Sequence, residues 1–213
     1  MTSSSKDKSL FRAFRRRRKS RREDDRFLAE VRLGRYALPP HSIKMKVMEE
    51  NTPSPRPGVF IETGTYHGDT VKEMKGRYRK VVSIEVDPVL CGKARERFRG
   101  DPNVEIILGD SVLELPRVLE ALSEPAVFWL DGHWSGEGTG KGEVEEPVLL
   151  SLRQIREHPV RGHVIFIDDA RYFDGRGGRP GIVEVLLRLQ EVDPSYRIRI
   201  LDDIVIAVPD QEG

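Results

Sequence analysis

The central part of the chain alternates between short apolar runs and longer segments with helical spacing. Each apolar run has four or five residues, the usual length of a strand buried in a parallel sheet, and each helical segment has nine to fifteen. This alternation predicts a parallel sheet with helices on both faces. The predicted strands are 59–62, 81–85, 104–108, 126–130 and 163–167, and the predicted helices between them are 70–78, 88–98, 111–122 and 143–157.

The C-terminal end of the chain departs from this pattern. After a predicted helix at 180–191, apolar runs at 196–201 and 204–208 are separated only by Asp202 and Asp203. Parallel neighbours cannot be joined so tightly, so these two runs are predicted to form an antiparallel hairpin. The predicted fold class is therefore α/β: a Rossmann-like doubly wound sheet of five parallel strands plus a C-terminal antiparallel β-hairpin.

Charge divides the chain into three predicted segments. Residues 6–22 contain ten basic residues and one acid, whereas the rest of the chain has a net charge of −8, within a total of +1. We expect residues 1–25 to form a basic, disordered tail, whose weak anionic partner is left open among RNA, anionic lipid and an acidic protein. Residues 26–57 are predicted to be a helical and linker segment with a short helix at 41–50, and residues 58–213 the folded domain.

Composition excludes several classes of protein. No run of eighteen apolar residues is present, so the sequence predicts no membrane span. Cys91 is the only cysteine, which excludes a disulfide scaffold, a CxxC redox motif and a thiolate zinc site. The N-terminus lacks the apolar stretch of a secretory leader, so we expect a cytoplasmic protein, with homo-oligomer formation left open.

The first predicted strand leads into the pattern Glu-x-Gly-x-x-x-Gly. Its first glycine permits a sharp turn close to a ligand, and its second permits a tight helix start. The motif differs from the dinucleotide-binding pattern Gly-x-Gly-x-x-Gly, because Tyr66 stands at the place of the second glycine. This difference weighs against NAD or FAD as the cofactor. The spacing instead resembles the first S-adenosylmethionine (SAM) binding motif of class I methyltransferases. The resemblance implies that the cofactor contacts Glu62, Gly64, Thr65, Tyr66 and Gly68.

The next two predicted strands also end in acids. Glu85 ends the second strand, where a carboxylate can accept hydrogen bonds from both hydroxyls of a ribose. The alternative role of helix cap suits Asp87 better, because it directly precedes Pro88. Asp110 follows the third strand and can bind the adenine amino group or cap the following helix, for which Ser111 is a second candidate. We therefore include Glu85, Asp110 and Ser111 in the predicted SAM site.

Carboxylates also follow the fourth and fifth predicted strands. Asp131 ends the fourth, and Asp168 and Asp169 end the fifth. Three carboxylates at one edge repel each other unless a cation neutralises them, and Mg²⁺ is a cation that prefers oxygen ligands. The sequence therefore predicts a Mg²⁺ site at Asp131, Asp168 and Asp169. The alternative is that Asp168 or Asp169 caps a turn or pairs with Arg171.

Two of these loops resemble the metal-binding loops of a known family. Leu130-Asp-Gly-His-Trp134 and Ile167-Asp-Asp169 are similar to those of cation-dependent O-methyltransferases, which include the macrocin-type sugar and the catechol O-methyltransferases. Uncharacterised bacterial methyltransferase-like proteins are also similar to this chain in two segments, Trp129-Leu-Asp-Gly-His-Trp-Ser-Gly and Pro40-His-Ser-Ile-Lys. The resemblance covers roughly residues 59 to 173.

The resemblance implies a function for the whole folded domain. Residues 58–213 would form a SAM-dependent methyltransferase domain, whose acceptor is a small hydroxylated molecule such as a sugar, a glycoside or a catechol. Mg²⁺ would lower the pKa of an acceptor hydroxyl, and Asp131 or His133 would take the proton as the catalytic base.

Two other functions stay open at this stage. RNA methylation would use the basic segment, but enzymes acting on exocyclic amino groups usually carry Asn/Asp-Pro-Pro-aromatic after the fourth strand, where this chain has Asp-Gly-His-Trp from residue 131. The second is a degenerate, SAM-binding protein whose work is done by the basic N-terminal arm.

Overall fold

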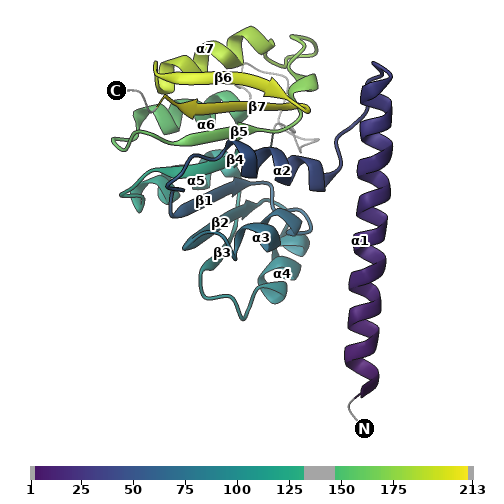
Figure 1. The fold of residues 1–213 in the computed structure, drawn as a ribbon. Coiled ribbons are helices and arrows are strands. Elements are labelled where there is room, and N and C mark those ends of the chain that lie inside the picture. Colours follow the sequence, from purple (N-terminus) through teal and green to yellow (C-terminus); the bar gives the residue numbers. More distant parts are fainter. Residues whose placement is uncertain (1–2, 132–146, 211–213) are drawn as a thin grey trace. The chain divides into compact units, whose positions relative to one another are not determined.

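The structure is a computed structural model that describes residues 3–131 and 147–210, with side chains from residue 18 onward. The chain divides into two compact units, Met1–Glu50 and Asn51–Gly213. Figure 1 labels the helices and strands of both units.

The first unit begins with a 30-residue helix, α1 (Ser3–Arg32). The segment has no glycine or proline before Gly34, and Lys and Arg are strong helix formers. Gly34 ends the helix at a φ of +68°, and the Arg35 N–H donates to the Glu30 carbonyl at 3.0 Å, which satisfies one carbonyl of the last turn. The sequence predicted a disordered tail over residues 1–25, whereas the structure continues one helix through residues 3–32.

The short helix expected at 41–50 is confirmed as α2 (His41–Asn51). It begins directly after two prolines, and the Pro40 carbonyl accepts the first helical hydrogen bonds from the Ile43 N–H at 2.9 Å and the Lys44 N–H at 3.1 Å. A proline at this position loses no hydrogen bond, because the first N–H groups of a helix have no partner within it.

The second unit contains a seven-stranded sheet in the order β3-β2-β1-β4-β5-β7-β6 (Figure 1). The five strands from β3 to β5 are parallel, while β7 is antiparallel to both of its neighbours, so the predicted doubly wound sheet with a C-terminal hairpin is confirmed. The strands are β1 (Val59–Thr63), β2 (Lys80–Glu85), β3 (Val104–Leu108), β4 (Ala126–Leu130), β5 (Val164–Ile167), β6 (Tyr196–Leu201) and β7 (Ile204–Pro209).

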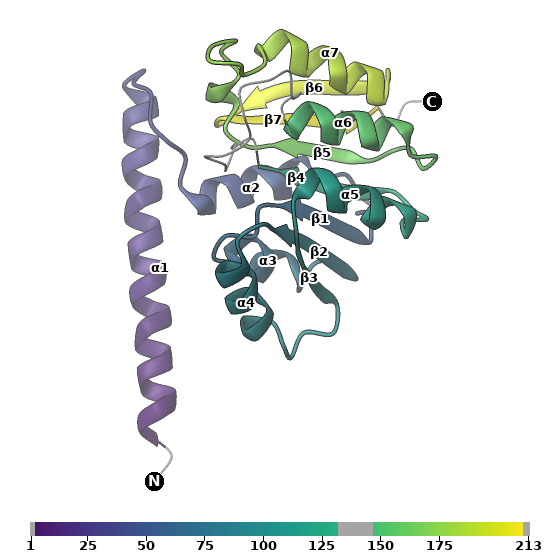
Figure 2. The ribbon, with the colours of Figure 1, turned by 180° about the vertical axis from the view of Figure 1, so that it is seen from behind.

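Helices cover both faces of the sheet. One group lies side by side on one face (Figure 2), and a second group lies on the opposite face (Figure 1). The part of the predicted helix 143–157 that precedes residue 147 lies outside the described residues. The first group is α5 (Ser111–Glu120), α6 (Pro147–Glu157) and α7 (Ile182–Val192), the second is α3 (Asp69–Met74) and α4 (Pro88–Arg97), and a 3₁₀ turn, η1 (Ala170–Tyr172), follows β5.

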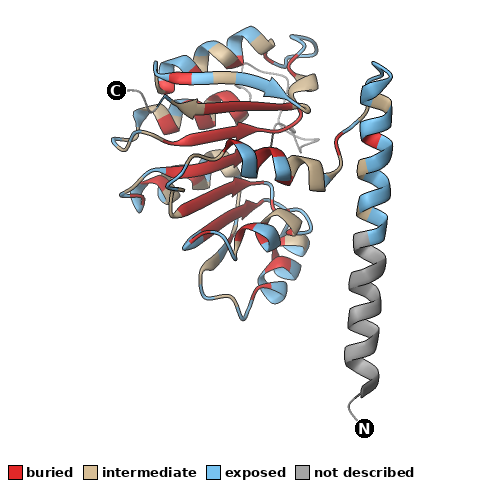
Figure 3. Cartoon of the chain, viewed as in Figure 1, coloured by how far each residue is buried: buried red, intermediate tan, exposed pale blue. Residues whose placement is uncertain are grey.

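The core lies along the central strands, which are buried along their whole length (Figure 3). Because both faces are covered, these strands are continuously apolar rather than alternating. Phe128 on β4 belongs to the core cluster that packs α5, α6 and α7 onto the sheet, while Phe60 and Phe166 are equally inaccessible to solvent.

The order of the strands reverses at one place in the sheet. The chain adds strands on one side of β1 as far as β3, and then continues on the other side with β4, so the order reverses between β1 and β4. Open α/β sheets bind ligands at such a reversal, beyond the carboxyl ends of the strands. We call this end of the sheet the carboxyl edge.

In the described part of the chain, no helix combines the length and apolar character needed to cross a membrane.

Candidate functional site

The turn after β1 brings two predicted loops into contact. Gly64 has a φ of +87°, and its N–H donates to the Ile84 carbonyl at 2.9 Å, which fastens the turn to the end of β2. A Cβ atom at Gly64 would lie 2.9 Å from Asp131 Oδ2. Glycine therefore allows the Asp131 carboxylate to lie directly against this turn, at the point where the strand order reverses.

The rest of the turn is held by the end of the second strand. Tyr66 has a φ of +48°, which is unfavourable for a non-glycine residue, and its N–H donates to Glu85 Oε2 at 2.7 Å. Gly68 has a φ of +70° as the N-cap residue of α3, and a Cβ there would lie 2.8 Å from the Phe98 ring. The predicted role of Gly68 in a tight helix start is confirmed.

Glu85 lies at the tip of β2 with its carboxylate fixed. It is 6% exposed, Oε2 accepts the Tyr66 N–H, and Oε1 accepts the Asp87 N–H at 2.9 Å. A carboxylate oxygen can accept two hydrogen bonds, so each oxygen keeps capacity for a further donor. This arrangement fits the predicted acceptor for two ribose hydroxyls, a role that stays a prediction.

Glu62 lies beneath the turn rather than at its surface. It is 2% exposed, and the Ser83 hydroxyl donates to its carboxyl group at 2.6 Å, while Ser83 and Thr65 share a hydrogen bond of 2.6 Å. Burial, helped by the charges of Asp131 and Glu85 and opposed by hydrogen bonds with Ser83 and Thr70, raises the pKa of Glu62 to about 8. Glu62 therefore keeps its proton to a higher pH than an exposed glutamate does, and it links β1 to β2 below the turn. Its predicted contact with a cofactor stays a prediction.

The residues after β3 differ in part from expectation. Asp110 is exposed and caps α5, accepting the Val112 N–H at 2.8 Å, so the expectation that Ser111 caps this helix is wrong, because Ser111 is its first helical residue. The cap predicted at Asp87 is confirmed, since its carboxylate accepts two N–H groups at the start of α4. The adenine contact of Asp110 and a cofactor contact of Ser111 stay predictions.

The carboxylates after β4 and β5 lie at the same edge. The Asp168 N–H donates to the Leu130 carbonyl at 2.9 Å, and the Asp131 N–H donates to the Thr63 hydroxyl at 3.1 Å, so β1, β4 and β5 end side by side. Asp168 is 9% exposed and accepts the N–H of Asp169 at 2.8 Å.

Asp169 is paired with an arginine. Its carboxylate accepts a hydrogen bond from Arg171 Nη1 at 2.6 Å, and the same nitrogen donates to Asp203, in the turn between β6 and β7. Burial alone would lower the pKa of Arg171, but its hydrogen bonds with Tyr172, Asp169 and Asp203 raise it above its ordinary value. Pairing with Arg171 was one of the alternatives that the sequence left open for Asp169, and the structure has this pairing.

The predicted Mg²⁺ site at Asp131, Asp168 and Asp169 stays a prediction. Among the residues that the structure describes, no three His, Cys, Asp or Glu side chains come together as a group that could hold a metal ion. The Asp169 carboxylate instead binds the Arg171 guanidinium. His133, the second predicted base, lies outside the described residues.

Sequence reasoning missed Asp203 as a residue of this edge. The Arg171 N–H donates to Asp203 Oδ1 at 2.9 Å, and the Ala170 N–H donates to the Asp203 carbonyl at 2.8 Å. A signal was present: because β7 is antiparallel to β5, the predicted hairpin turn at 202–203 must return to the carboxyl end of β5.

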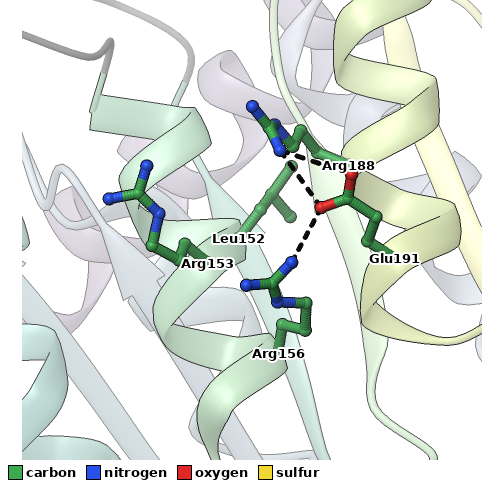
Figure 4. Close-up of a pocket in the computed structure, with 5 residues that line it drawn as sticks. All are labelled: Leu152, Arg153, Arg156, Arg188 and Glu191. Carbon is green, nitrogen blue, oxygen red and sulfur yellow. Dashed lines mark hydrogen bonds and ion pairs between the residues drawn. The ribbon is translucent and has the colours of Figure 1, made fainter.

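A small hollow lies elsewhere, between α6 and α7 (Figure 4). Glu191 accepts hydrogen bonds there from Arg156 at 2.9 Å and from Arg188 at 3.2 Å. The hollow has about 10 Å³ of free volume, about enough for one water molecule. Its lining residues lie on helices, away from the carboxyl edge, so it is not part of the candidate site.

Comparisons with known proteins point to methyltransferases. No family model matches the chain. An rRNA adenine N-6-methyltransferase of Saccharopolyspora erythraea is 36% identical over 56 residues, which cover 26% of this chain and 15% of that protein. A probable ribosomal RNA small subunit methyltransferase A of Methanosarcina barkeri is 37% identical over 59 residues, 27% of this chain and 21% of that protein. The chain thus matches less than a quarter of the length of these curated relatives.

Solved structures match over most of the chain. An O-methyltransferase from Bacillus cereus in complex with SAH has a TM-score of 0.57 at 14% identity, over 88% of this chain and 90% of that one. A putative caffeoyl-CoA O-methyltransferase from Staphylococcus aureus has a TM-score of 0.54 at 15% identity, over 96% and 99% of the two chains. The 23S rRNA methyltransferase ErmE has a TM-score of 0.53 at 19% identity, over 84% and 71%. The fold is that of the class I SAM-dependent methyltransferases.

Proposed function

We propose that this protein is a SAM-dependent methyltransferase that methylates a hydroxyl oxygen of a small acceptor, such as a sugar, a glycoside or a catechol. The observation that carries the proposal is the contact between the Gly64 turn and the Asp131 carboxylate, beside the buried Glu85, at the strand reversal of a class I methyltransferase fold. At this point a turn that admits a ligand meets an acid that can take a proton.

The residues of the carboxyl edge have distinct roles in this proposal. Gly64 lets the backbone approach the cofactor, Glu85 accepts the ribose hydroxyls, and Asp110 binds the adenine amino group while it caps α5. When bound, SAM supplies a methyl group that is already activated by its sulfonium. The protein then needs only to orient an acceptor hydroxyl and to remove its proton.

Asp131 is the residue to which we assign proton removal. Its backbone is fixed by the hydrogen bond to the Thr63 hydroxyl, and its carboxylate lies against the Gly64 turn, so it is positioned next to the proposed cofactor. A base so held acts without a further search for the correct geometry. Because Asp169 binds Arg171, the proposed reaction uses no metal ion, and the role of His133 stays a prediction.

The cofactor assignment is tested by replacing Glu85 with alanine. We expect the affinity for SAM to fall by about 1–3 kcal/mol, because two ribose hydroxyls lose a charged acceptor. Isothermal titration calorimetry measures this directly. Glu105→Ala is the matched control, since Glu105 is an exposed acid on the neighbouring strand β3. Unchanged SAM affinity in a folded Glu85→Ala protein would refute the assignment.

The acceptor class is tested by methyl transfer to a panel of sugars, glycosides and catechols, with and without EDTA. We expect Asp131→Asn to lose at least about tenfold in kcat, because the amide cannot take a proton, while SAM affinity stays within about twofold. Transfer that is abolished by EDTA in the unaltered protein would instead favour the metal-assisted reaction that the sequence predicted.

Methylation of RNA is the second candidate function. Two observations favour it: the curated relatives are named as rRNA methyltransferases, and α1 carries the exposed basic residues Arg18, Lys19, Arg21 and Arg22. The acids of the carboxyl edge count against it, because they would repel RNA phosphates. Transfer of labelled methyl groups to total RNA, compared with transfer to the small-molecule panel, distinguishes RNA methylation from methylation of a small acceptor.

The third function is that of a degenerate, SAM-binding protein that acts through its basic N-terminal arm. Deleting residues 1–22 tests it, and normal turnover by the shortened protein would contradict it.

A further inference from the structure

We infer that the Arg171 guanidinium takes the place of a divalent metal ion beside the carboxylates of this edge. The same side chain joins the loop after β5 to the β6–β7 hairpin. The consequence for the reaction, that methyl transfer needs no divalent ion, rests on the proposed function. The consequence for metal binding and stability does not.

The Arg171 guanidinium compensates two buried carboxylates. The side chains of Asp169 and Asp203 are only 3% and 6% exposed, so neither carboxylate can rely on water to stabilise its charge. Two buried carboxylates close together raise the free energy of the folded state unless a cation lies between them. Nη1 of Arg171 donates to both, so a single group compensates both charges.

Arg171 and a metal ion would compete for the same oxygen atom of Asp169. Asp169 is one of the three acids that the sequence assigns to Mg²⁺, and its Oδ1 lies 2.6 Å from Arg171 Nη1. A metal ion bound at that oxygen would place its charge next to the guanidinium, and the two cations would repel each other. Occupation by one therefore disfavours occupation by the other.

The backbone around Arg171 is held in an unfavourable conformation. Asp169, Asp202 and Asp203 all have positive φ values, between 47° and 64°, which cost free energy in residues other than glycine. The Ala170 and Arg171 N–H groups donate hydrogen bonds to Asp203 at this point. The strained loop after β5 and the strained turn between β6 and β7 are therefore hydrogen-bonded to each other beside the ion pairs. Contacts of this kind are what keep a strained conformation populated.

The guanidinium is also restrained from its open side. Its central carbon lies 4.4 Å from the centre of the Tyr172 ring, within the range of a cation–π contact. The arginine is therefore held by two carboxylates and an aromatic ring, and its side chain is only 23% exposed. Such a group is a fixed charge rather than a mobile surface arginine.

The test measures Mn²⁺ binding to the full chain by electron paramagnetic resonance, together with thermal unfolding with and without Mn²⁺. We expect no stoichiometric Mn²⁺ binding and no shift in Tm for the unaltered protein. Arg171→Met removes the cation but keeps a long side chain. We expect it to have a lower Tm, and to recover part of the loss in Mn²⁺, with an affinity for the ion at least about tenfold higher, because Asp169 and Asp203 are then uncompensated.

Two further variants serve as controls. Arg171→Lys keeps the positive charge, so we expect it to bind no Mn²⁺ and to retain more stability than Arg171→Met. Arg179→Met removes an arginine of the same loop that pairs with Asp174 and lies 5.9 Å from the centre of the Tyr172 ring, and we expect it to gain no affinity for Mn²⁺.

Two outcomes would overturn the inference. One is that the unaltered protein binds one Mn²⁺ per chain and that Asp169→Asn abolishes this binding. The other is that Arg171→Met folds without any gain in Mn²⁺ affinity. If Arg171→Met does not fold even in Mn²⁺, the titration of the unaltered protein still decides, since one bound ion lost in Asp169→Asn refutes the inference and no binding supports it. Neither readout depends on SAM, so failure of the Glu85→Ala test would leave this inference intact.

Discussion

The two edges of the central sheet hold their buried polar groups in different ways. At the carboxyl edge, Tyr66, Asp169, Asp202 and Asp203 have positive φ values, and carboxylates are paired with arginine or with backbone N–H groups. At the opposite, amino edge, the described residues other than glycine have ordinary φ values. Backbone strain and buried acids thus gather at the edge where open α/β sheets bind ligands, which is expected of a site in which the surrounding structure enforces an unfavourable geometry.

The amino edge buries neutral groups instead. His163 accepts the Ala126 N–H at 3.1 Å through Nδ1, and the Tyr196 hydroxyl donates to the His163 carbonyl at 2.9 Å. Burial lowers the pKa of His163 to about 4, with the charge of His158 as a second cause, and burial also raises the pKa of Tyr196 above its ordinary value. These buried groups of the amino edge are therefore neutral and contribute to stability. The difference between the two edges indicates that one sheet can keep neutral, stabilising groups at one edge and acids suited to chemistry at the other.

The largest expected effect is that of Gly64→Ala, at the centre of the carboxyl edge. A φ of +87° and a contact of 2.9 Å with Asp131 both oppose a Cβ atom. We expect stability to fall by about 1–3 kcal/mol and SAM affinity to fall by about a hundredfold or more, because the turn must move. Urea unfolding and calorimetry measure the two effects.

Gly76→Ala is the matched control for this prediction, because a Cβ there meets no atom within 4 Å and φ is not in the left-handed region. If Gly64→Ala bound SAM as tightly as Gly76→Ala, the turn would not be the cofactor site, and the functional half of the comparison would fail.

Glu62→Gln examines the buried acid of the carboxyl edge. Its folded pKa is about 8 against an ordinary value of 4.5, so the unfolded chain ionises first and the unaltered protein loses stability as pH rises through this interval. We expect a loss on the order of 2–4 kcal/mol between about pH 5 and pH 9, largely absent in Glu62→Gln, whose amide cannot ionise. Urea unfolding over this pH range measures it, with Glu105→Gln as the exposed control. Equal slopes in the unaltered protein and Glu62→Gln would mean that Glu62 is already ionised at neutral pH.

His163→Asn examines the amino edge, where the slope has the opposite sign. The folded pKa of His163 is about 4 against an ordinary value of 6.5, so the unfolded chain takes up the proton first and stability falls as pH decreases through this interval. We expect the unaltered protein to lose about 2 kcal/mol between about pH 7 and pH 4.5. Asn keeps an acceptor for the Ala126 N–H but does not titrate, so the variant should have a flatter profile. His67→Asn, at an exposed position, is the control, and a profile in His163→Asn as steep as in this control would contradict the prediction.

The local pattern of apolar and polar residues was sufficient to predict most of the strands and helices. The predicted strands agree with β1 to β7 to within about one residue at each end. The buried strands β4 and β5 are continuously apolar, the edge strand β6 alternates between apolar residues and arginine, and both patterns are visible in the sequence. The cap at Asp87 was equally predictable, since proline at the first helical position reinforces it. Where two neighbouring residues both suited a cap, at Asp110 and Ser111, composition could not choose, because the choice depends on which one adopts the extended backbone.

The chemistry of the carboxyl edge was determined by tertiary structure. The sequence alone established that acids lie at the ends of five neighbouring strands. It offered Mg²⁺ as a partner for Asp131, Asp168 and Asp169, and Arg171 as an alternative partner for Asp168 or Asp169. The pairing of Arg171 with Asp203, 32 positions away, arises only when the antiparallel hairpin returns its turn to the end of β5. Likewise, Glu62 keeps its proton to a higher pH than an exposed glutamate does because folding buries it beneath the Gly64 turn. Strand and helix periodicity is a local property of the chain, whereas the charge state and the partner of a carboxylate depend on the groups that folding places around it.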